Sequence, residues 1–305
     1  MFSTLPNQHC MHKFKICCLL ILLAISKNSY SQIDDLVRLD YTNIPPGKSD
    51  IQYSRIKGLF NFPIKLSNEK TYLFLGLDYS HLDLRMPDNP SFDNEEIDDF
   101  QILNLNIMYT RPIKNNWRLG FRLAPGVSSN LTAKALTFGD LVLSGDVVLI
   151  KDKTGDKTIK KPWRLIFGVS YSGDRGFPFP LPFLSYYRKL NSKWSYNFGI
   201  PKSNLQYHIS QSHRLKLYAE LDGFTSNMQK IIIVDGNKQA ESINMSMILG
   251  GLQYEYYPLK HLEFYFRTSY IFSKALELRD KNKNKVLELD SSNSLYLRTG
   301  IAFKI

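Results

Sequence analysis

The last eleven residues of the chain, 295–305, alternate between an apolar face and a more polar face. Leucine, threonine, isoleucine and phenylalanine occupy one face, whereas tyrosine, arginine, glycine, alanine and lysine occupy the other. A period of two with one apolar face is typical of a half-buried β-strand. A final strand of this kind, in a chain that carries an export signal, is typical of a β-barrel that spans a membrane.

Residues 1–31 are predicted to be a cleaved signal peptide. Two lysines precede an apolar run over residues 16–25, and the small residues at 29 and 31 stand where a signal peptidase reads the chain. Cleavage is expected between Ser31 and Gln32. A membrane anchor is the alternative, but the apolar run is too short to span a bilayer. The signal therefore predicts export from the cytoplasm.

The remaining residues, 32–305, are expected to form one large β domain. All three cysteines, at positions 10, 17 and 18, fall within the predicted signal peptide, so we expect no disulfide, thiol chemistry or thiolate metal site in the mature chain. The formal net charge of +11 is compatible with nucleic-acid binding. The basic residues lie in loops and at alternate strand positions, however, so no nucleic-acid partner is expected.

The hydropathy pattern favours strands over helices as the membrane-spanning elements. No segment after the signal approaches the ~18 consecutive apolar residues of a membrane helix. A mean hydropathy of −0.25 suits a barrel, because every second strand residue faces a polar interior. A soluble β-sandwich is the main alternative. Many segments alternate for about ten residues or more, the length of a strand that crosses a bilayer, so we predict an antiparallel up-and-down transmembrane β-barrel.

Polar turn clusters and alternating segments together define the expected strands. Fourteen are expected, near residues 34–42, 50–66, 71–86, 98–112, 117–128, 136–150, 162–172, 181–190, 194–200, 204–210, 214–226, 242–257, 261–276 and 289–305. An even number leaves both ends of the barrel chain on the periplasmic side, as bacterial barrels require. Because residues 194–210 form a short pair and residues 181–190 alternate poorly, twelve strands is the alternative.

The expected connections alternate between short and long. Short polar turns are expected near residues 67–70, 114–116, 191–193, 211–213 and 258–260. Long connections are expected over residues 86–98, 128–135, 173–182, 227–241 and 279–288. In outer-membrane barrels the short turns are periplasmic and the long loops are extracellular. Residues 151–161 depart from this pattern, because they form a long, basic connection at the short-turn end.

Aromatic residues follow several of the short connections. The residues concerned are Tyr72, Trp117, Trp163 and Trp194. Indole and phenol rings prefer the boundary between hydrocarbon and water, where the ring is half apolar and its polar atom stays hydrated. These four residues are predicted to form an interface girdle, and a general preference for aromatics at strand starts is the alternative.

Charged residues on the polar faces of the strands are the best functional candidates. The predicted lumen-facing residues are Arg55, Lys57, Arg118, Arg122, Arg164, Lys216, Glu220, Glu255, Glu263, Arg267 and Arg298. Rings of charge set the ion preference of a water-filled pore, and the excess of arginine favours anionic solutes. The alternative is that these groups pair across the lumen and close it. The sequence leaves both interpretations open.

No motif indicates a catalytic, cofactor or metal site, so we expect neither an enzyme nor a cofactor. The acidic residues between 88 and 99 lack the ligand spacing of a Ca²⁺ loop, and a solvated outer loop explains them. The four histidines after the signal have no metal-binding spacing, and no serine–histidine motif indicates a hydrolase. Residues 173–180 are expected to form an ordered outer loop, with a constriction of the mouth or a surface ligand site as alternatives.

The run Ile-Pro-Pro-Gly-Lys-Ser-Asp-Ile-Gln-Tyr-Ser at residues 44–54, with the signal and the final strand, resembles a family of Bacteroidota outer-membrane barrels that is known as a domain of unknown function. The resemblance spans nearly all of the mature chain and names no activity. It implies the architecture and an outer-membrane location. Such a location implies contact with membrane lipid and lipopolysaccharide and, during biogenesis, with periplasmic chaperones and the barrel-assembly machinery.

The hypothesis from the sequence is a monomeric, porin-like passive channel for small solutes. A closed structural, adhesion or ligand-binding barrel is the first alternative. A barrel-embedded lipid hydrolase is the second. Electrical conductance of the purified protein in planar bilayers separates the channel from the closed barrel.

Overall fold

The structure is a computed structural model that describes residues 35–47, 50–67, 70–86, 95–133, 135–177, 179–234 and 237–304. The predicted signal peptide lies outside these residues. Within the described ranges, no helix is long and apolar enough to cross a membrane.

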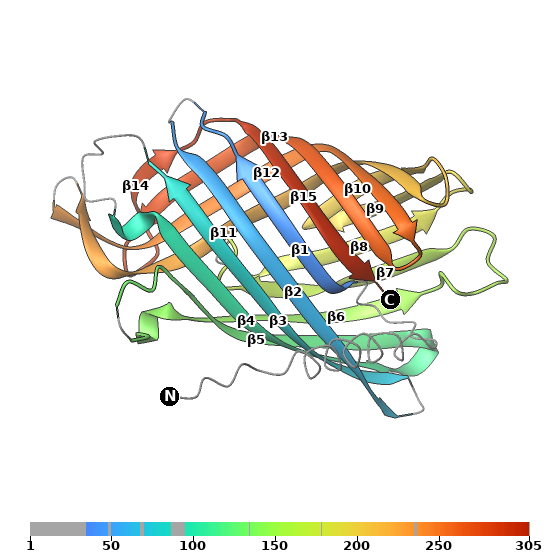
Figure 1. Ribbon diagram of the computed structural model, residues 1–305. Coiled ribbons are helices and arrows are strands. Elements are labelled where there is room, and N and C mark those ends of the chain that lie inside the picture. Colours follow the sequence, from blue (N-terminus) through green and yellow to red (C-terminus); the bar gives the residue numbers. More distant parts are fainter. Residues whose placement is uncertain are drawn as a thin grey trace, which may run out of the picture.

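The described chain is almost entirely β-structure (Figure 1). The first eight strands are β1 (Asp35–Ile44), β2 (Gln52–Ser67), β3 (Thr71–Arg85), β4 (Asp99–Pro112), β5 (Trp117–Ser129), β6 (Leu141–Asp152), β7 (Trp163–Ser172) and β8 (Leu181–Lys189). The others are β9 (Trp194–Ile200), β10 (Lys202–His208), β11 (His213–Val234), β12 (Lys238–Leu259), β13 (Leu262–Arg279), β14 (Lys285–Asp290) and β15 (Leu295–Lys304). Three short 3-10 helices lie in the connections: η1 (Glu95–Ile97), η2 (Lys114–Asn116) and η3 (Phe138–Asp140).

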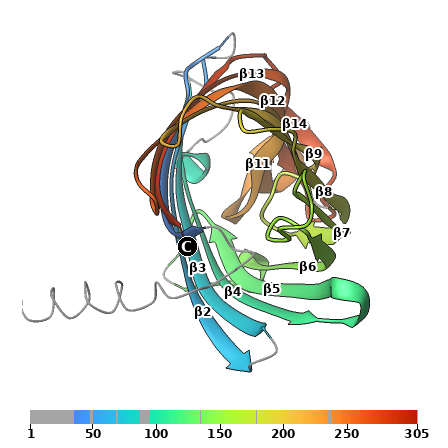
Figure 2. The ribbon, with the colours of Figure 1, turned by 90° about the vertical axis from the view of Figure 1, so that its right-hand side faces the viewer.

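Fourteen of these strands close into an antiparallel barrel, as the sequence predicts. Each strand from β1 to β13 pairs with the next one along the chain, and β13 also pairs with β15. The ring closes where β1 pairs with β15, with Asp35 opposite Lys304 and Asp40 opposite Gly300. Figure 2 shows the ring along its axis. Closure satisfies the backbone amides of the wall strands, which hydrocarbon cannot do.

The C-terminal segment differs from the prediction. The sequence predicts one strand over residues 289–305, but the chain forms β14 and β15 there, separated by residues 291–294. β14 pairs with the outer part of β13, with Leu278 opposite Leu287, and lies outside the ring of fourteen. Val286, Leu287 and Leu289 pack against apolar residues inside the barrel, which fixes this extra strand.

The connection between β11 and β12 also differs from the prediction. Residues 227–241 are predicted to be a long loop, but most of them continue the two strands, with Ile232 opposite Ala240. Both strands are 22 residues long, well beyond what crosses a bilayer. The run Lys230–Val234 is rich in β-branched residues, which favour strands. The prediction of a long loop did not take this preference into account.

The outward faces of the wall strands are apolar. On β11, Leu215 and Leu217 are exposed, whereas Lys216 between them faces inward and pairs with Glu255. Exposed outward side chains on other strands include Leu77, Leu103, Phe121, Val169, Phe198 and Phe266. An apolar exterior of this extent is typical of a surface that contacts lipid. The soluble β-sandwich is therefore excluded, because the apolar faces lie outside the barrel and not between two sheets.

The two ends of the barrel differ in their connections. One end has mostly short turns and holds Asp35 and Lys304, the two ends of the described chain. The long connection between β6 and β7, residues 153–162, also lies at this end, as the sequence predicts. The opposite end holds β14, η1, η3 and the tip of the β11–β12 hairpin (Figure 1). Because short turns face the periplasm in bacterial barrels, we name these the periplasmic end and the outer end.

Candidate functional site

The predicted lumen-facing residues all lie on the inward faces of their strands. They are Arg55, Lys57, Arg118, Arg122, Arg164, Lys216, Glu220, Glu255, Glu263, Arg267 and Arg298. Most of them fall into two groups, one at mid-height and one at the periplasmic end. Arg118 lies at the extreme periplasmic end, where its guanidinium donates to the backbone carbonyl of Lys70 at 2.7 Å.

The mid-height group forms ion pairs that cross the lumen. Arg55 on β2 lies 3.1 Å from the carboxylate of Asp222 on β11, and Arg298 on β15 lies 2.6 Å from the same carboxylate. The hydroxyl of Tyr296 donates to Asp222 at 2.7 Å. Four wall strands, β1, β15, β13 and β12, separate β2 from β11 around the ring, so the Arg55–Asp222 pair joins two separate parts of the wall.

A second carboxylate completes this group. Arg267 and Lys202 lie 3.1 Å and 2.9 Å from the carboxylate of Glu220. We call Arg55, Lys202, Glu220, Asp222, Arg267 and Arg298 the charge belt. Buried charges need partners because removing them from water costs several kcal/mol per ion. The belt therefore places four cations around two carboxylates in the middle of the lumen, so that each cation has a carboxylate partner. Pairing across the lumen is the arrangement that the sequence left as an alternative to an open pore.

Further inward charges pair along the wall. Lys57 lies 2.8 Å from Asp78 on the adjacent strand. Arg122 pairs with Asp146 and donates to the side-chain oxygen of Asn106 at 3.0 Å. Neighbouring strands place such side chains about 5 Å apart on one face. These ion pairs therefore form within the regular geometry of the sheet.

Apolar side chains fill the lumen between the charge belt and the outer end. They come from the outer ends of β1–β4, β11–β13 and β15, and include Tyr53, Leu84, Phe100, Phe224, Met245 and Ile271. The ring centres of Tyr53 and Phe100 lie 5.9 Å and 6.0 Å from that of Phe224. We call this cluster the outer core. A close-packed apolar interior leaves no path for water, so the outer core closes the mouth in this structure.

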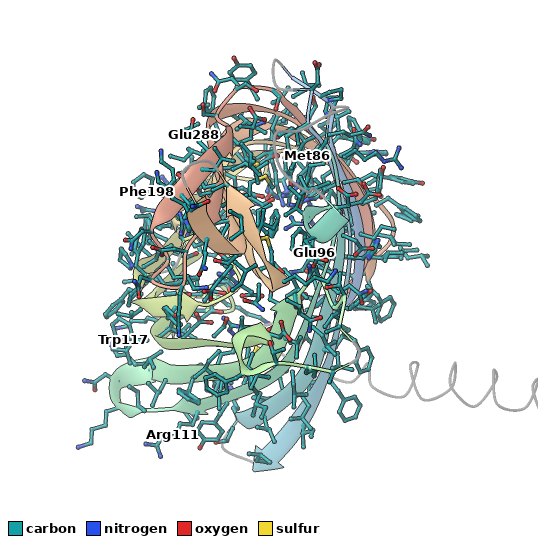
Figure 3. All side chains as sticks on the ribbon, turned by 90° about the vertical axis from the view of Figure 1, so that its left-hand side faces the viewer. Met86, Glu96, Arg111, Trp117, Phe198 and Glu288 are labelled. Atoms are coloured by element: carbon teal, nitrogen blue, oxygen red, sulfur yellow. The ribbon has the colours of Figure 1, made fainter. Side chains whose placement is uncertain are left out.

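The β11–β12 hairpin contributes to the outer core by bending across the mouth. Ser128 on β5 donates to the backbone oxygen of Thr225 at 2.8 Å, and Ser129 pairs with Asn227 in a parallel bridge. Five strands separate β5 from β11 around the ring, so these contacts span the lumen. Figure 2 shows β11 within the outline of the ring. Seen from the outer end in Figure 3, Glu96 lies near the centre, whereas Trp117 and Phe198 lie at the periphery.

Polar contacts hold the hairpin to the opposite wall. The carboxylate of Glu96 on η1 accepts from Asn130 at 2.8 Å, Thr132 at 2.9 Å and Lys230 at 2.7 Å. We call these four residues the latch. Burial by itself raises the pKa of Glu96, but the hydrogen bonds from Lys230, Thr132 and Asn130 outweigh it and lower the pKa below its ordinary value. Glu96 is thus a buried structural acid, and the predicted solvated loop is wrong for this residue.

Asp140 on η3 makes a second set of contacts to the hairpin. Its carboxylate accepts from the Asn227 amide at 2.8 Å, the Gln229 amide at 2.7 Å and the Thr137 backbone N–H at 2.7 Å. Burial opposes ionisation of this carboxyl, but these donors and the Ser129 hydroxyl lower its pKa to about 2. The ionised form of Asp140 therefore favours the closed position of the hairpin.

The acidic residues that the sequence analysis considered for a divalent ion do not form a site. Asp88 and Asp93 lie outside the described residues, and Glu96 is engaged in the latch. Among the described residues, no three acidic, histidine or cysteine side chains form a group that holds a metal ion.

A polar cavity of about 630 Å³ opens at the periplasmic end. Five basic side chains line it: Arg164, Lys189, Arg214, Lys216 and Lys304. No acidic residue is among its described lining residues. Glu255 and Glu263 pair with Lys216 and Lys304 from behind the lining, and Arg214 stacks at 4.3 Å on the ring of Tyr257. We call this cavity the vestibule. Its lining favours anions because five cations converge on it and only two of them, Lys216 and Lys304, pair with a carboxylate in the described part of the chain.

A serine and a histidine meet at the edge of the vestibule, a pair that no sequence motif indicated. The Ser195 hydroxyl lies 3.0 Å from Nε2 of His208, and the Gln206 amide lies 3.2 Å from the same nitrogen. A hydrolytic triad needs an orienting group on the other ring nitrogen and an accessible nucleophile. The Ser195 side chain is fully buried, so this pair has the geometry of a structural hydrogen bond and not of a triad.

Three of the four predicted girdle residues lie on the outward face near the periplasmic end. Trp117 makes an edge contact with the outward Phe167, Trp163 lies near Tyr186, and Trp194 lies near Tyr207. Tyr72 differs, because it shares the inward face of β3 with Phe74 and carries the guanidinium of Arg118 over its ring. Whether an aromatic ring points outward or inward is thus set by its place in the alternation of the strand, and not by its position after a short turn.

A family model described as a domain of unknown function, DUF6268, matches residues 40–304. This match covers nearly the whole barrel. The chain is a member of the DUF6268 family. Membership agrees with the family resemblance in the sequence and names no activity for the barrel. A comparison with curated protein sequences gave no match.

Solved structures of outer-membrane barrels are similar to this DUF6268 barrel in fold. An outer membrane channel from Pseudomonas putida F1 has 10% identity and a TM-score of 0.45, over 92% of this chain and 98% of that chain. The NanC porin has 10% identity and a TM-score of 0.38, over 88% and 100%. Outer membrane phospholipase A from Escherichia coli has 10% identity and a TM-score of 0.32, over 92% and 95%. These likenesses concern the fold alone, and the barrel fold supports an outer-membrane location.

Sequence reasoning found most of the charged residues of this DUF6268 barrel but missed several that decide its shape. Lys202 and Asp222 of the belt were not singled out, although both lie at inward positions beside predicted residues. Strand parity extended through the short β9–β10 pair identifies Lys202. The latch has no signal in the sequence, because Glu96 and Lys230 are 134 positions apart.

Proposed function

We propose that this protein is a passive outer-membrane channel for small anionic solutes, and that its outer mouth is closed in the state described here. The vestibule is the entrance or exit on the periplasmic side. The β11–β12 hairpin is the gate on the outer side. The proposal includes assembly by the periplasmic chaperones and barrel-assembly machinery that serve such barrels, and contact with lipid and lipopolysaccharide.

The single observation that carries the proposal is the one-sided charge of the vestibule. Lys216 and Lys304 have buried carboxylate partners, but Arg164 and Lys189 make no ion pair within the part of the chain that the structure describes. Cations without carboxylate partners repel one another, so exposing them to the lumen does not stabilise a closed structural barrel. A water-filled site that concentrates anions does gain from it.

Reversal potentials of the purified protein in planar lipid bilayers under a salt gradient test this proposal. Wild type is expected to give discrete current steps with a preference for chloride over potassium. Arg164→Gln with Lys189→Gln is expected to lower that preference, because it removes two unmatched cations from the vestibule. Lys114→Gln is the control, since Lys114 is an exposed cation at the same end but outside the vestibule. Equal selectivity in all three proteins would contradict the proposal.

A closed ligand-binding or structural barrel is the second candidate. The observations that favour it are the ion pairs of the belt across the lumen and the packed outer core. Silence at every voltage, in wild type and in variants with a weakened latch, would favour this candidate over a channel. We propose no catalytic role, because Ser195 is buried and the histidine beside it lacks a triad partner. Release of fatty acid from phospholipid by the purified protein would instead support the lipid hydrolase.

A further inference from the structure

The barrel wall is lower at β9 and β10 than at the strands on either side. These two strands have only seven residues each and turn at Pro201. Ile200 lies opposite Leu184 on β8, and Lys202 lies opposite Glu220 on β11. Beyond these positions toward the outer end, no strand lies between β8 and β11 in the described chain. Neighbouring strands are about 5 Å apart, so two missing strands leave a gap that is wide enough for a hydrocarbon chain.

The connection between β7 and β8 covers this gap from above. The backbone oxygen of Asp174 accepts from the Thr225 N–H on β11 at 2.9 Å, and its carboxylate accepts from Asn104 across the lumen at 2.7 Å. Gly176 lies so close to the backbone of Met245 that a Cβ would not fit. The chain segment 173–177 is thus fixed inside the barrel. The sequence favoured an ordered outer loop here, but the structure has the alternative, a loop folded into the mouth.

A cavity of about 360 Å³ lies between this loop and the β9–β10 turn. Pro201 forms its floor, and Phe177 and Phe179 form its roof. Leu181 and Leu221 border it on the two sides of the gap. Leu221 shares the outward face of β11 with Leu217, so this side of the cavity is bordered by a residue of the lipid-facing face. The volume lies in the range of small-molecule sites, and the lining near the wall is apolar.

The inner end of the same cavity is charged. It is lined there by Arg55, Lys202, Glu220, Asp222 and Arg298 of the belt, in which each cation has a carboxylate partner. Arg175, on the loop that forms the roof, also lines the cavity and is exposed. Its guanidinium forms no ion pair within 4 Å in the described ranges, although Asp174 and Asp146 are close enough to interact with it electrostatically. The cavity therefore joins apolar side chains near the wall with one exposed cation that makes no direct contact with a carboxylate.

We propose that this cavity is a side portal that binds a single-chain amphiphile with an anionic headgroup, taken from the membrane. The hydrocarbon chain lies between Leu181, Phe179 and Leu221, and the headgroup meets Arg175. A guanidinium suits an anionic oxygen group because it donates several hydrogen bonds in a fixed plane. Only the onward route, from the portal to the vestibule, rests on the proposed channel function; binding at the portal does not.

The test uses the full chain in phosphatidylcholine vesicles that contain a trace of palmitic acid carrying a photoreactive diazirine on its chain. Illumination and mass spectrometry map the labelled residues. Labels are expected to gather on Phe177, Phe179, Leu181 and Leu221. Leu221→Trp fills the gap from the lipid side and is expected to lower this labelling about tenfold. Leu217→Trp is the matched control, because it places the same ring on the same outward face away from the cavity.

The headgroup is tested with a second probe. Arg175→Gln is expected to weaken labelling by the photoreactive fatty acid about tenfold but not labelling by the corresponding neutral alcohol, because only the acid loses a charge-assisted hydrogen bond. Arg85→Gln, an exposed outer-end arginine outside the cavity, is the control. If Leu221→Trp does not form a folded barrel, Phe179→Glu on the exposed roof serves in its place and should repel the acid alone.

The outcomes separate the portal from the channel. Labels spread evenly around the lipid-facing surface, or unchanged in Leu221→Trp, would overturn the portal even if the vestibule conducts anions. Labels confined to the cavity in a protein that never conducts would support the portal and overturn the channel. Equal loss of acid and alcohol labelling in Arg175→Gln would overturn the assignment of an anionic headgroup.

Discussion

Arg55 on β2 and Asp222 on β11 form an ion pair of 3.1 Å across the lumen, although the two residues are 167 positions apart in the chain. Arg298 shares the same carboxylate. The pair divides the lumen into a closed outer part and an open periplasmic part, because the outer core begins immediately beyond it. The arrangement of the lumen therefore depends on groups that lie on different walls of the barrel.

Asp222→Asn is expected to destabilise the barrel by about 3–5 kcal/mol, because it leaves Arg55 buried without a carboxylate and Arg298 with only the more distant Glu220. Guanidinium unfolding of the protein in detergent micelles measures this change. Glu288→Gln serves as the control, since Glu288 forms an exposed pair with Lys285 at the outer end and should matter little. Equal unfolding midpoints for wild type and Asp222→Asn would show that the belt does not stabilise the fold.

Glu96→Ala is expected to raise the fraction of time that the channel is open. The change removes the acceptor of three hydrogen bonds between η1, the wall and the hairpin, a loss of about 1–3 kcal/mol. That cost corresponds to roughly a tenfold or larger shift in an equilibrium between closed and open states. Single-channel recording in planar bilayers measures the open fraction.

The control for the latch is Glu288→Ala, which removes an acid at the same end of the barrel but outside the latch. Its open fraction should match that of wild type. An unchanged open fraction in Glu96→Ala, in a protein that conducts, would place the gate elsewhere than in the β11–β12 hairpin.

The contacts of Asp140 make stability depend on pH in the acid range. Its pKa of about 2 in the folded protein lies below its ordinary value near 3.8, so the ionised group stabilises the fold above pH 4 and that contribution disappears as the pH falls toward 2. Wild type is expected to exceed Asp140→Asn in unfolding free energy by up to about 2 kcal/mol at pH 6, and the difference should vanish near pH 2. Urea unfolding at a series of pH values measures it, and a difference that is constant with pH would contradict this assignment.

The lipid-facing band predicts that the cost of a charge depends on its depth. Leu217→Arg places a guanidinium on the outward face near the middle of the barrel wall and should cost about 2–4 kcal/mol, whereas Leu259→Arg at the turn between β12 and β13 should cost about 0–1 kcal/mol. Unfolding in lipid vesicles gives both values. Equal costs at the two positions would mean that the exposed leucines of β11 do not lie in hydrocarbon.

The alternation of apolar and polar residues was sufficient to predict the strands of the barrel wall. Where one residue in two is apolar over a long segment, as in β11 from Leu215 to Leu221, the pattern alone fixes which side chains share one face of the strand. The inward direction of Arg267 and Glu220 follows from that parity. The same reasoning failed for β14, whose apolar residues pack into the barrel and not against lipid, because a pattern of alternation does not say what the apolar face touches.

The sequence by itself determined the class of fold, the fourteen wall strands and most of the inward charges, because each of these depends on local periodicity. Only the tertiary structure decided which charges meet, that the β11–β12 hairpin closes the outer mouth, and that the wall is low at β9 and β10. The physical reason is that these features depend on contacts across the lumen. Such contacts join residues on strands that are not neighbours, and nothing in the local pattern of either strand records the other.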